Sequence, residues 1–358
     1  ASAARHPRLP LPRDLFAPHR QNSRGVEFGC RAALQGLLDE IAAARGAPAE
    51  AAAIVNGTKR SGSARDAISP IDGAIVGRAI EAGADLADEA VQAARLGFPA
   101  WSQTPAADRA AIIERAGDLL EGARGRLIHL LQVEGGKTLD DAVAELREAV
   151  DYCRYYAAEG RSLFGAGAAM PGPTGETDRL RLRGRGPFVA ISPWNFPLAI
   201  FLGQVLAALM AGNSVVAKPA EQTPLVAAEA VRLLHEAGIP GTALHLVPGD
   251  GAIGARLVGH RDAAGVVFTG STEVARSINR ALAAKDGPIV PLIAETGGIN
   301  AMIADATAFP EQVADDVLTS AFRSAGQRCS ALRLLCLQEE VADRMIAMIA
   351  GAVRALRL

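Results

Sequence analysis

The sequence of 358 residues predicts an α/β fold, in which a mainly parallel sheet is covered by helices on both faces. Short apolar runs typical of buried strands recur after Gly186, and segments with helical spacing of apolar residues separate them. The composition is that of a folded chain, because 49% of the residues are hydrophobic and 21% are charged. At roughly 150 residues per domain, this length suggests about two domains.

The charge and cysteine content narrow the class of protein. Thirty-seven Lys and Arg nearly balance 39 Asp and Glu, which argues against nucleic acid or an anionic membrane as a partner. No apolar run of about 18 residues is uninterrupted, so we expect no transmembrane segment. The four cysteines form no CxxC pair and show no metal-type spacing with the six histidines. We therefore expect a cytoplasmic protein without a metal site.

The first half of the chain is predicted to be mostly helical. Residues 1–28 are rich in Pro and Arg, and we expect a solvated arm or linker there. An Ala- and Leu-rich helix is expected from Cys30 to about Ala53, broken at Gly46 and Pro48. Turns are expected at Asn56-Gly57, Ser69-Pro70 and Asp72-Gly73, and helices over 84–96, 106–120, 124–134 and 139–158, with breaks at Pro99 and Pro105.

The second half carries the strand signals. An exposed hairpin is expected within 165–186, where glycine and proline are frequent and apolar residues then alternate with arginine. Apolar runs predict strands over 188–191, 214–217, 244–247 and 265–268, with two more near 289–294 and 300–303. Strands that alternate with helices of about 10–15 residues indicate a parallel sheet.

One glycine-rich turn matches a dinucleotide-binding pattern. Residues 249–254 read Gly-Asp-Gly-Ala-Ile-Gly between a predicted strand and a predicted helix, and Glu273 follows at about the distance of a ribose-binding acid. In a chain with 37 glycines, an ordinary strand-to-helix turn explains the match equally well. The pattern supports a nucleotide-binding domain but does not place phosphates on this turn.

Two residues in polar, glycine-rich contexts are candidates for covalent chemistry. Cys329 lies in SAGQRCS, and a thiolate there would be a strong nucleophile toward a carbonyl carbon. Glu295 begins ETGG at the end of an apolar run, a suitable place for a general base. The alternatives are a buried apolar cysteine and a solvated loop carboxylate. Cys153 and Cys336 lie among apolar residues and are expected in the core.

Two loops after predicted strands carry candidate binding groups. Asn195, in PWNFP, has an amide that can donate to an oxyanion, although Asn more often serves the turn itself. Lys218 and Glu221, in KPAEQTP, can each hydrogen-bond a ribose diol, with solvated loop charges as the alternative.

Six motifs in order resemble the NAD(P)-dependent aldehyde dehydrogenase superfamily. They are PWNFP, KPAEQTP, VPGDG, FTGST, ETGG and GQRCS, and the 34 positions from Glu295 to Cys329 also agree with it. The resemblance covers about residues 50–358. It implies an aldehyde dehydrogenase-like fold, with a Rossmann-type sheet domain, a β-hairpin flap and the beginning of a second α/β catalytic domain.

The resemblance also implies a role for each matching residue. Cys329 would attack the aldehyde to give a thiohemiacetal, with Asn195 and the Cys329 N–H group as the oxyanion hole. Hydride transfer to nicotinamide would leave a thioester, and Glu295 would activate the water that hydrolyses it. The aldehyde pocket would include Phe196, Ser330 and Glu148.

The implied cofactor is NAD. Lys218 and Glu221 match residues that hold the adenosine ribose, and the Glu221 carboxylate would repel the 2′-phosphate of NADP. The ribose role therefore passes from Glu273 to Glu221. Ala275 departs from the glycine that many relatives have at this place. The residues expected to bind the cofactor are Ser192, Pro193, Trp194, Lys218, Glu221, Gly251, Phe268, Thr269, Gly270, Ser271 and Thr272.

The start of the chain resembles one group within the family. Residues 9–16 and 22–25 are similar to the segment that joins two enzymes in bifunctional proline utilization A proteins. These enzymes are an FAD-dependent proline dehydrogenase and an L-glutamate-γ-semialdehyde dehydrogenase. The resemblance implies L-glutamate γ-semialdehyde as substrate, and FAD only in a preceding proline dehydrogenase module of the same polypeptide. A general or succinate-semialdehyde dehydrogenase, and a non-catalytic nucleotide-binding fragment, are the alternatives.

The family pattern divides the chain into segments. Residues 1–28 would be the arm, 29–165 with 187–294 the NAD-binding domain, 166–186 a flap used for oligomerisation, and 295–358 the start of the catalytic domain. Family members continue beyond the position that matches Leu358, so we expect the sequence to be an excerpt of a longer polypeptide at both ends. A homo-oligomer is expected.

Overall fold

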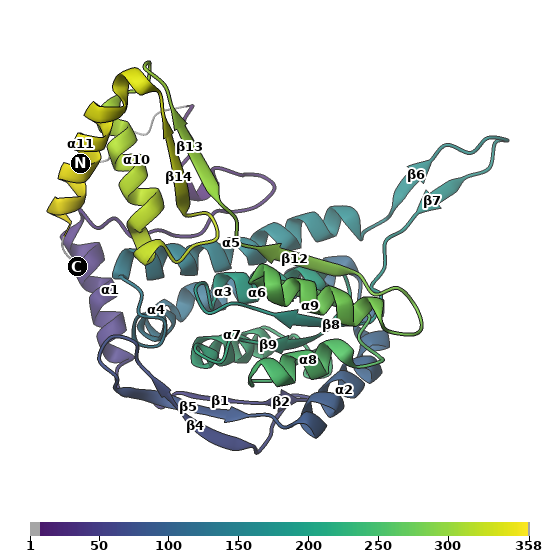
Figure 1. Cartoon of the computed structure of the whole chain (residues 1–358). Helices are drawn as coiled ribbons and strands as arrows, with labels where there is room; N and C mark the ends of the chain where they lie inside the picture. The colour runs from purple at the N-terminus through teal and green to yellow at the C-terminus, as the bar shows by residue number, and fades with distance from the viewer. Residues whose placement is uncertain (1–7, 357–358) are drawn as a thin grey trace. The chain divides into compact units, whose positions relative to one another are not determined.

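The computed structural model describes residues 8–356, which form two compact units (Figure 1). The first unit runs through Thr269 and includes Val274–Ala294, and the second holds Gly270–Glu273 and the chain from Glu295 onward. Residues 1–7 of the predicted arm and 357–358 of the predicted catalytic segment lie outside the described residues.

A seven-stranded sheet forms the centre of the first unit. Its inner strands β11, β8, β9 and β10 run parallel, while β2 and β3 extend it in antiparallel fashion at one edge. The α/β class is confirmed, and the parallel strands lie where the apolar runs predict them. In sheet order the strands are β12 (Leu292–Thr296), β11 (Gly265–Gly270), β8 (Pro187–Ile191), β9 (Ser214–Lys218), β10 (Leu244–Leu246), β2 (Ile54–Val55) and β3 (Thr58–Lys59).

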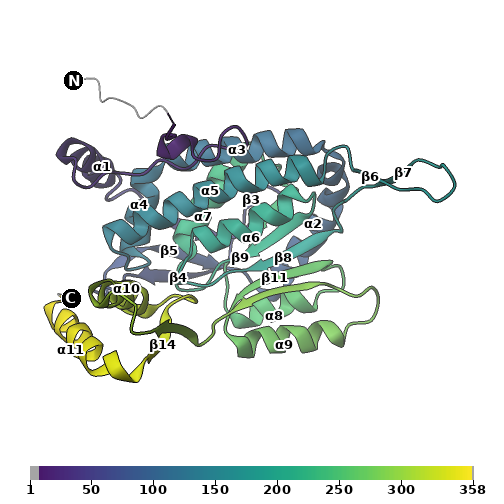
Figure 2. The same cartoon turned by 90° about the horizontal axis from the view of Figure 1, so that it is seen from above.

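Successive residues of the inner strands enter two different apolar cores. Phe188 and Val215 join the core on one face, whereas Val189 and Val216 join the core on the other. This alternation follows from the two-residue period of a strand, and it requires apolar residues at every position because both faces are covered. In Figure 2, helices α3, α5 and α6 lie on one side of β8, and α8 and α9 lie on the other.

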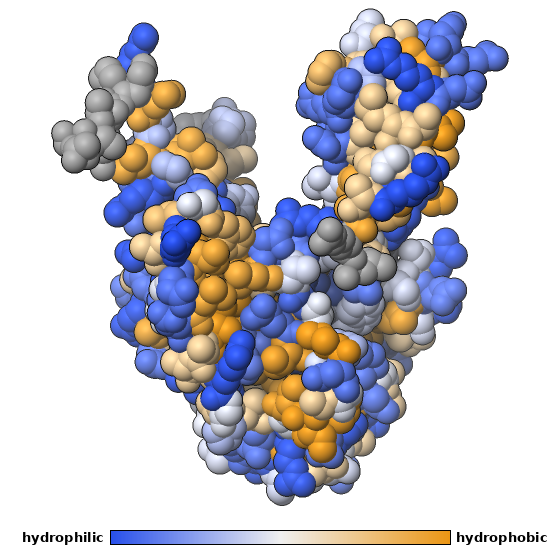
Figure 3. All heavy atoms as spheres, turned by 90° about the vertical axis from the view of Figure 1, so that its left-hand side faces the viewer, coloured by the Kyte–Doolittle hydropathy of each residue, from blue (hydrophilic) through white to orange (hydrophobic). Residues whose placement is uncertain are grey.

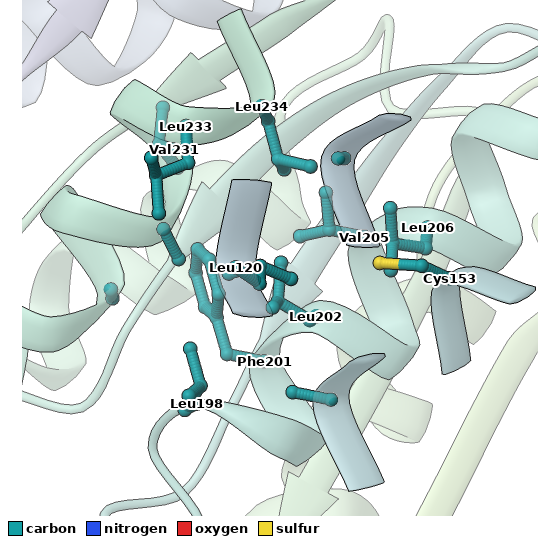
Figure 4. Packing of buried hydrophobic residues seen from close by; sticks show 14 of the residues in the cluster. Leu120, Cys153, Leu198, Phe201, Leu202, Val205, Leu206, Val231, Leu233 and Leu234 are labelled. Carbon is teal, nitrogen blue, oxygen red and sulfur yellow. The ribbon is translucent and has the colours of Figure 1, made fainter. Parts of the chain in front are cut away.

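The helices of the first unit bury apolar faces against these cores. Figure 4 shows Phe201, Leu202 and Val205 of α6 packed among side chains from the neighbouring helices, including Cys153. The helices are α1 (Arg31–Ala43), α2 (Ala84–Gln103), α3 (Ala106–Gly122), α4 (Arg124–Val133), α5 (Leu139–Leu163), α6 (Ala199–Met210), α7 (Pro224–Glu236), α8 (Gly251–Gly259) and α9 (Thr272–Ala283).

The break expected at Pro99 is wrong, because α2 continues through it to Gln103. Packing on either side of Pro99 outweighs the hydrogen bond that its ring removes. Gly97 lies so close to the backbone of Thr242 that a Cβ there would be 1.9 Å from the Thr242 carbonyl oxygen. Trp101 is buried, and its indole N–H donates to the Leu209 carbonyl at 3.0 Å.

The helix expected to reach Ala53 is also wrong over its last residues. Helix α1 ends at Ala43, and Glu50–Ala52 forms strand β1, which pairs in parallel with β5 (Ile75–Glu81). Strand β4 (Ser63–Ile68) completes this three-stranded sheet. The helix ends before Gly46, whose φ of 75° is left-handed, and burial of the small Ala51 side chain outweighs the helix preference of alanine.

Two turns follow their predicted chemistry. Asn56 and Gly57 have φ values of 53° and 73° and join β2 to β3, as a tight hairpin with left-handed central residues requires. The hairpin expected within 165–186 is also present, and Figures 1 and 2 show it projecting from the end of α5. It consists of β6 (Ala168–Met170) and β7 (Asp178–Leu180), whose residues are exposed.

The described part of the arm is docked rather than solvated as expected. The N–H and hydroxyl groups of Ser23 donate to the two carboxylate oxygens of Asp151 at 2.8 and 2.7 Å. Arg154 donates to the Asn22 carbonyl at 2.9 Å, and Arg24 is 3.5 Å from Glu121. The acidic groups of α3 and α5 therefore fix the arm. A short 3-10 helix, Pro12–Asp14, precedes this contact.

The second unit has a small core of its own. Strands β13 (Asn300–Ala304) and β14 (Leu332–Leu337) pair in parallel, separately from the large sheet. Their buried residues pack with α10 (Pro310–Phe322) and α11 (Glu339–Ala355). The sequence pattern misses β14, and Cys336 is exposed on it rather than in the core as expected.

Apolar side chains also reach the surface in places. Figure 3 shows one face on which apolar patches alternate with hydrophilic residues. Exposed examples in the first unit are Ile68, Ile71 and Ile75, near the turn between β4 and β5. Among the helices of residues 8–356, none combines the length and the apolar character needed to cross a bilayer.

The buried imidazole of His245 on β10 gives the first testable prediction. The Asn56 N–H group donates to its Nδ1 at 3.2 Å, and its Nε2 faces the Thr242 carbonyl at 3.3 Å, so the neutral ring fits the site. Burial lowers the pKa of His245 to about 4. Because the unfolded chain binds this proton at higher pH, stability should be lost as pH falls from about 6.5 to 4.

Urea unfolding of the native chain and of His245→Gln at several pH values tests this linkage. The free energy of unfolding of the native chain should fall relative to the variant by up to about 3 kcal/mol between pH 7 and pH 4. Parallel pH curves for the two proteins would contradict the assignment.

Candidate active site

The cofactor residues predicted in the first unit gather at one edge of the sheet. Ser192 follows β8, Lys218 ends β9, Gly251 follows β10, and Phe268 and Thr269 lie at the end of β11. These strands are parallel, so their carboxyl ends meet at the same edge, which is the usual ligand-binding edge of such sheets. Because each of these residues follows or ends a predicted parallel strand, the sequence alone predicts that they lie close together.

Lys218 and Glu221 form the charged part of this edge. The Lys218 side chain is 4% exposed, and its Nζ donates to the Pro219 carbonyl at 3.0 Å and lies 3.9 Å from a Glu221 carboxylate oxygen. Burial lowers the pKa of Lys218, and the carboxylates of Glu221, Asp250 and Glu81 oppose that shift. Glu221 is about half exposed, so this pair offers one buried donor and one accessible acceptor.

The turn that matches the dinucleotide pattern has its helix donors already engaged. Oδ1 of Asp250 accepts hydrogen bonds from the N–H groups of Ala252 and Ile253 at 2.9 and 3.2 Å. A phosphate bound there would have to displace this carboxylate. Gly254 instead packs beside Lys218, since a Cβ at Gly254 would lie 3.5 Å from the lysine Cδ atom.

Polar side chains near the end of β8 are buried. Ser192 is 4% exposed, and its hydroxyl has no hydrogen-bond partner among the described residues. Gln204 of α6 donates to the Ile191 carbonyl at 3.2 Å and to the Thr269 hydroxyl at 2.8 Å, which ties the ends of β8 and β11 together. Trp194 is 44% exposed at the same edge.

The loop that carries Asn195 is held from below by a buried ion pair. Oε1 of Glu145 accepts hydrogen bonds from the N–H groups of Leu198 and Ala199 at 2.8 and 3.2 Å, and Oε2 is 2.9 Å from Nζ of Lys137. Burial raises the pKa of Glu145, while Lys137 and the two N–H donors oppose the shift. The same ammonium lies 4.2 Å from the centre of the Phe196 ring, a cation–π contact.

A second buried glutamate holds the helix that follows Lys218. Glu134, 3% exposed, accepts hydrogen bonds from Leu225 and Val226 on its two oxygens, at 2.7 and 2.9 Å. Burial raises the pKa of Glu134, while the N–H groups of Leu225 and Val226 oppose that shift and favour the ionised carboxylate. The sequence interpretation missed Glu134, Glu145 and Lys137. A charged residue at helical spacing from the apolar Ala142 and Ala149 was the signal available for Glu145.

The second unit contains Cys329, Ser330 and Glu295, all exposed. The amide of Asn300 donates to the carbonyls of Cys329 and Ala331 at 2.7 and 2.9 Å, which fixes the backbone on both sides of Ser330. Ser324 and Ala325 have φ values of 54° and 53°, and this left-handed backbone precedes the cysteine turn. Such strain in residues other than glycine is typical of functional loops.

The remaining candidates are divided between the units. Asn195 and Phe196 are half-buried in the first unit, where Glu148 is exposed on α5 and accepts a hydrogen bond from the Tyr152 hydroxyl at 3.1 Å. Pro193 lies in the same β8 loop. Gly270 ends β11, and Ser271 and Thr272 begin the α9 segment grouped with the second unit. Among the described residues, no group of His, Cys, Asp or Glu is arranged to hold a metal ion.

Comparison with known proteins extends the sequence resemblance. The sequence model of the Aldehyde dehydrogenase family matches residues 57–358. The chain is 46% identical to bifunctional protein PutA of Escherichia coli over 358 residues, which cover 99% of this chain and 26% of that protein. It therefore spans about a quarter of the length of this relative.

Solved structures give the same picture. A mutant of proline utilization A from Bradyrhizobium japonicum superposes with a TM-score of 0.87 and 68% identity, over 98% of this chain and 33% of that one. A 1-pyrroline-5-carboxylate dehydrogenase from Thermus with bound NAD superposes with a TM-score of 0.89 and 29% identity, over 94% of this chain and 66% of that one.

The four free thiols should differ in reactivity. Cys153 is 0% exposed, and burial raises its pKa to about 12, whereas Cys30, Cys329 and Cys336 are exposed. We expect a thiol reagent at pH 8 to modify the three exposed cysteines of the folded chain and to reach Cys153 only after denaturation. Mass mapping of the labelled cysteines measures this, and labelling of Cys153 at the rate of Cys30 would contradict the buried assignment.

Proposed function

Since the chain belongs to the aldehyde dehydrogenase family, we propose that it is the aldehyde-oxidising part of an NAD-dependent enzyme. Its reaction is the oxidation of L-glutamate γ-semialdehyde to L-glutamate in proline catabolism. The observation that carries the proposal is the family match over residues 57–358, which includes Cys329 on an exposed, backbone-braced turn.

The proposed mechanism uses Cys329 as the nucleophile. Its thiolate attacks the aldehyde carbon, so a C–S bond forms and the carbonyl oxygen becomes an oxyanion. The Asn195 amide and the Cys329 N–H group donate hydrogen bonds to that oxygen. Bound NAD supplies the acceptor for the hydride that leaves the same carbon. Glu295 then takes a proton from water, which attacks the resulting thioester, breaks the C–S bond and releases the acid.

The residues at the edge of the sheet fit a dinucleotide. Lys218 and Glu221 provide a donor and an acceptor for a ribose diol, and the buried hydroxyl of Ser192 has no hydrogen-bond partner among the described residues. The Glu221 carboxylate disfavours a 2′-phosphate, so NAD is proposed over NADP. The remaining cofactor contacts proposed are Pro193, Trp194, Gly251 and Phe268–Thr272. A relative from Thermus was solved with NAD.

The substrate and partner proposals rest on the relatives. The PutA relative is named as bifunctional, and the Thermus relative acts on 1-pyrroline-5-carboxylate by its name. We propose that a proline dehydrogenase module with FAD belongs to the same polypeptide, in the cytoplasm. Phe196, Ser330 and Glu148 are proposed to line the aldehyde pocket. The β6–β7 hairpin is proposed to serve a homo-oligomer, because its residues are exposed and it extends away from the core.

The proposed segments follow this assignment. Residues 29–165 and 187–294 would bind NAD, 166–186 would form the flap, 1–28 the arm, and 295–358 the start of the catalytic domain.

Pre-steady-state kinetics of the complete polypeptide that contains this chain test the two-step chemistry. We expect Cys329→Ala to abolish both NADH formation and its initial burst, because no thiohemiacetal can form. Glu295→Gln should keep the burst but lower the steady-state rate by about 100-fold or more, because only hydrolysis of the thioester needs the base. Cys336→Ala, which removes another exposed thiol of the second unit, is the matched control. Turnover retained in Cys329→Ala would contradict the mechanism.

A panel of aldehydes tests the substrate. We expect kcat/KM for L-glutamate γ-semialdehyde to exceed that for succinate semialdehyde and for unbranched aliphatic aldehydes by about 100-fold or more, since a site built for polar groups rejects analogues that lack them. Equal values across the panel would indicate a general aldehyde dehydrogenase. A higher value for succinate semialdehyde would indicate that enzyme instead.

A further inference from the structure

One connection of the first unit supports both loops at the edge of the sheet. Helix α4 ends before Glu134, and Glu145 lies in the second turn of α5, so both glutamates flank residues 135–144. Strands β8 and β9 are neighbours in the sheet, and each leads through a loop into a helix. The loop after β8 contains Asn195, and the loop after β9 contains Glu221.

The two supported helices begin in the same way. Helix α6 begins at Ala199, directly after Pro197-Leu198, and helix α7 starts with Pro224-Leu225-Val226. Proline has no N–H group, and the next two N–H groups donate to a buried glutamate in each case. Both glutamates thus satisfy donors that a helix start leaves without an intrahelical partner.

We propose that Glu145 and Glu134 are positioning residues, Glu145 for the Asn195 loop and Glu134 for the Lys218–Glu221 loop. Each acts through the first turn of the helix that ends the loop. Because both glutamates flank the same connection, residues 135–144, they fix the spacing between the oxyanion donor and the nucleotide-binding pair. The proposal rests on the function proposed above.

Lys137 makes the support of the Asn195 loop tighter. Its ammonium pairs with Glu145 at 2.9 Å and also lies over the ring of Phe196, the residue that follows Asn195 in the chain. The Lys137 side chain is 6% exposed and that of Glu145 is 0% exposed, so water does not screen the pair. The Lys137 ammonium therefore links the connection of residues 135–144 both to the Glu145 carboxylate and to the Asn195 loop.

A carboxylate suits this task better than an amide of the same shape. Glu145 accepts two N–H groups on Oε1 and forms an ion pair through Oε2, and Glu134 accepts one N–H group on each oxygen. Glutamine has one acceptor oxygen, and its NH2 group would face a backbone N–H group in place of Glu134 and the Lys137 ammonium in place of Glu145. Glu→Gln at either position keeps the volume but leaves a buried donor unsatisfied, which is a helix N–H group at position 134 and the Lys137 ammonium at position 145. We expect the helix start to shift at position 134, and at position 145 we expect the repelled amide to weaken its two hydrogen bonds to the helix start.

The test measures kcat and NAD affinity separately in the complete polypeptide. Glu145→Gln should lower kcat about tenfold or more and change the Kd of NAD less than about twofold, because misplaced reacting groups cost rate. Glu134→Gln should raise the Kd of NAD about tenfold and change kcat at saturating NAD less than about threefold. Lys137→Gln should resemble Glu145→Gln. A general structural role would instead change both quantities together in all three variants, and that result would overturn the proposal.

Hydrogen exchange gives a readout that does not depend on turnover. In Glu145→Gln, the amides of Leu198 and Ala199 should exchange faster while those of Leu225 and Val226 keep their protection, and Glu134→Gln should show the reverse. Glu114→Gln is the matched control, since it removes an exposed carboxylate paired with Arg161 on the same helical layer. If a glutamine variant does not fold, Lys137→Gln still tests the Asn195 loop.

The outcomes separate this proposal from the proposed function. If the native protein does not oxidise the aldehyde, the proposed function is overturned. Hydrogen exchange then still tests whether Glu145 and Glu134 position the two loops. Native turnover combined with unchanged exchange at residues 198–199 and 225–226 in the two glutamine variants would overturn the positioning alone.

Discussion

Burial of the parallel sheet on both faces is the constraint from which the rest of the first unit follows. Residues on β8 and β9 alternate between two apolar cores, so neither strand can carry a functional side chain along its length. On these two strands, polar groups are confined to the strand ends. The carboxyl edge therefore collects Ser192, Lys218 and the loop of Asn195, and the separate sequence motifs become neighbours there.

The same burial makes internal partners necessary for the helix starts at that edge. Helices α6, α7 and α8 all begin there, and each start is satisfied by a carboxylate, from Glu145, Glu134 and Asp250 respectively. Asp250 belongs to its own turn, whereas the two glutamates come from a distant connection. The edge is thus held by carboxylates that serve the backbone, while Glu221 remains accessible to a ligand.

Local patterns predict most elements of this chain, and the failures have a common cause. Apolar runs locate the inner strands because complete burial leaves few other interpretations. Strand β1 was missed because its alanines favour a helix in isolation, and only pairing with β5 makes them a strand. Glu134 and Glu145 were missed because their partners lie 91 and 53 positions away along the chain. Cys329 could be singled out as a candidate because its signal is local, in the small residues that surround it in sequence.

The energetics of the buried ion pair between Glu145 and Lys137 explain why such a pair is suited to support the Asn195 loop. Removing two ions from water costs several kcal/mol each, and their attraction returns that free energy only when geometry and hydrogen bonds are good. An apolar pair of similar volume would be as stable or more so, so stability does not account for the pair. An apolar pair, however, could not accept the N–H groups of Leu198 and Ala199, nor hold Phe196 through a directed cation. What the ion pair adds is a defined position for the backbone beside Asn195, and a loop that is proposed to present one amide to a reacting oxygen would depend on that position.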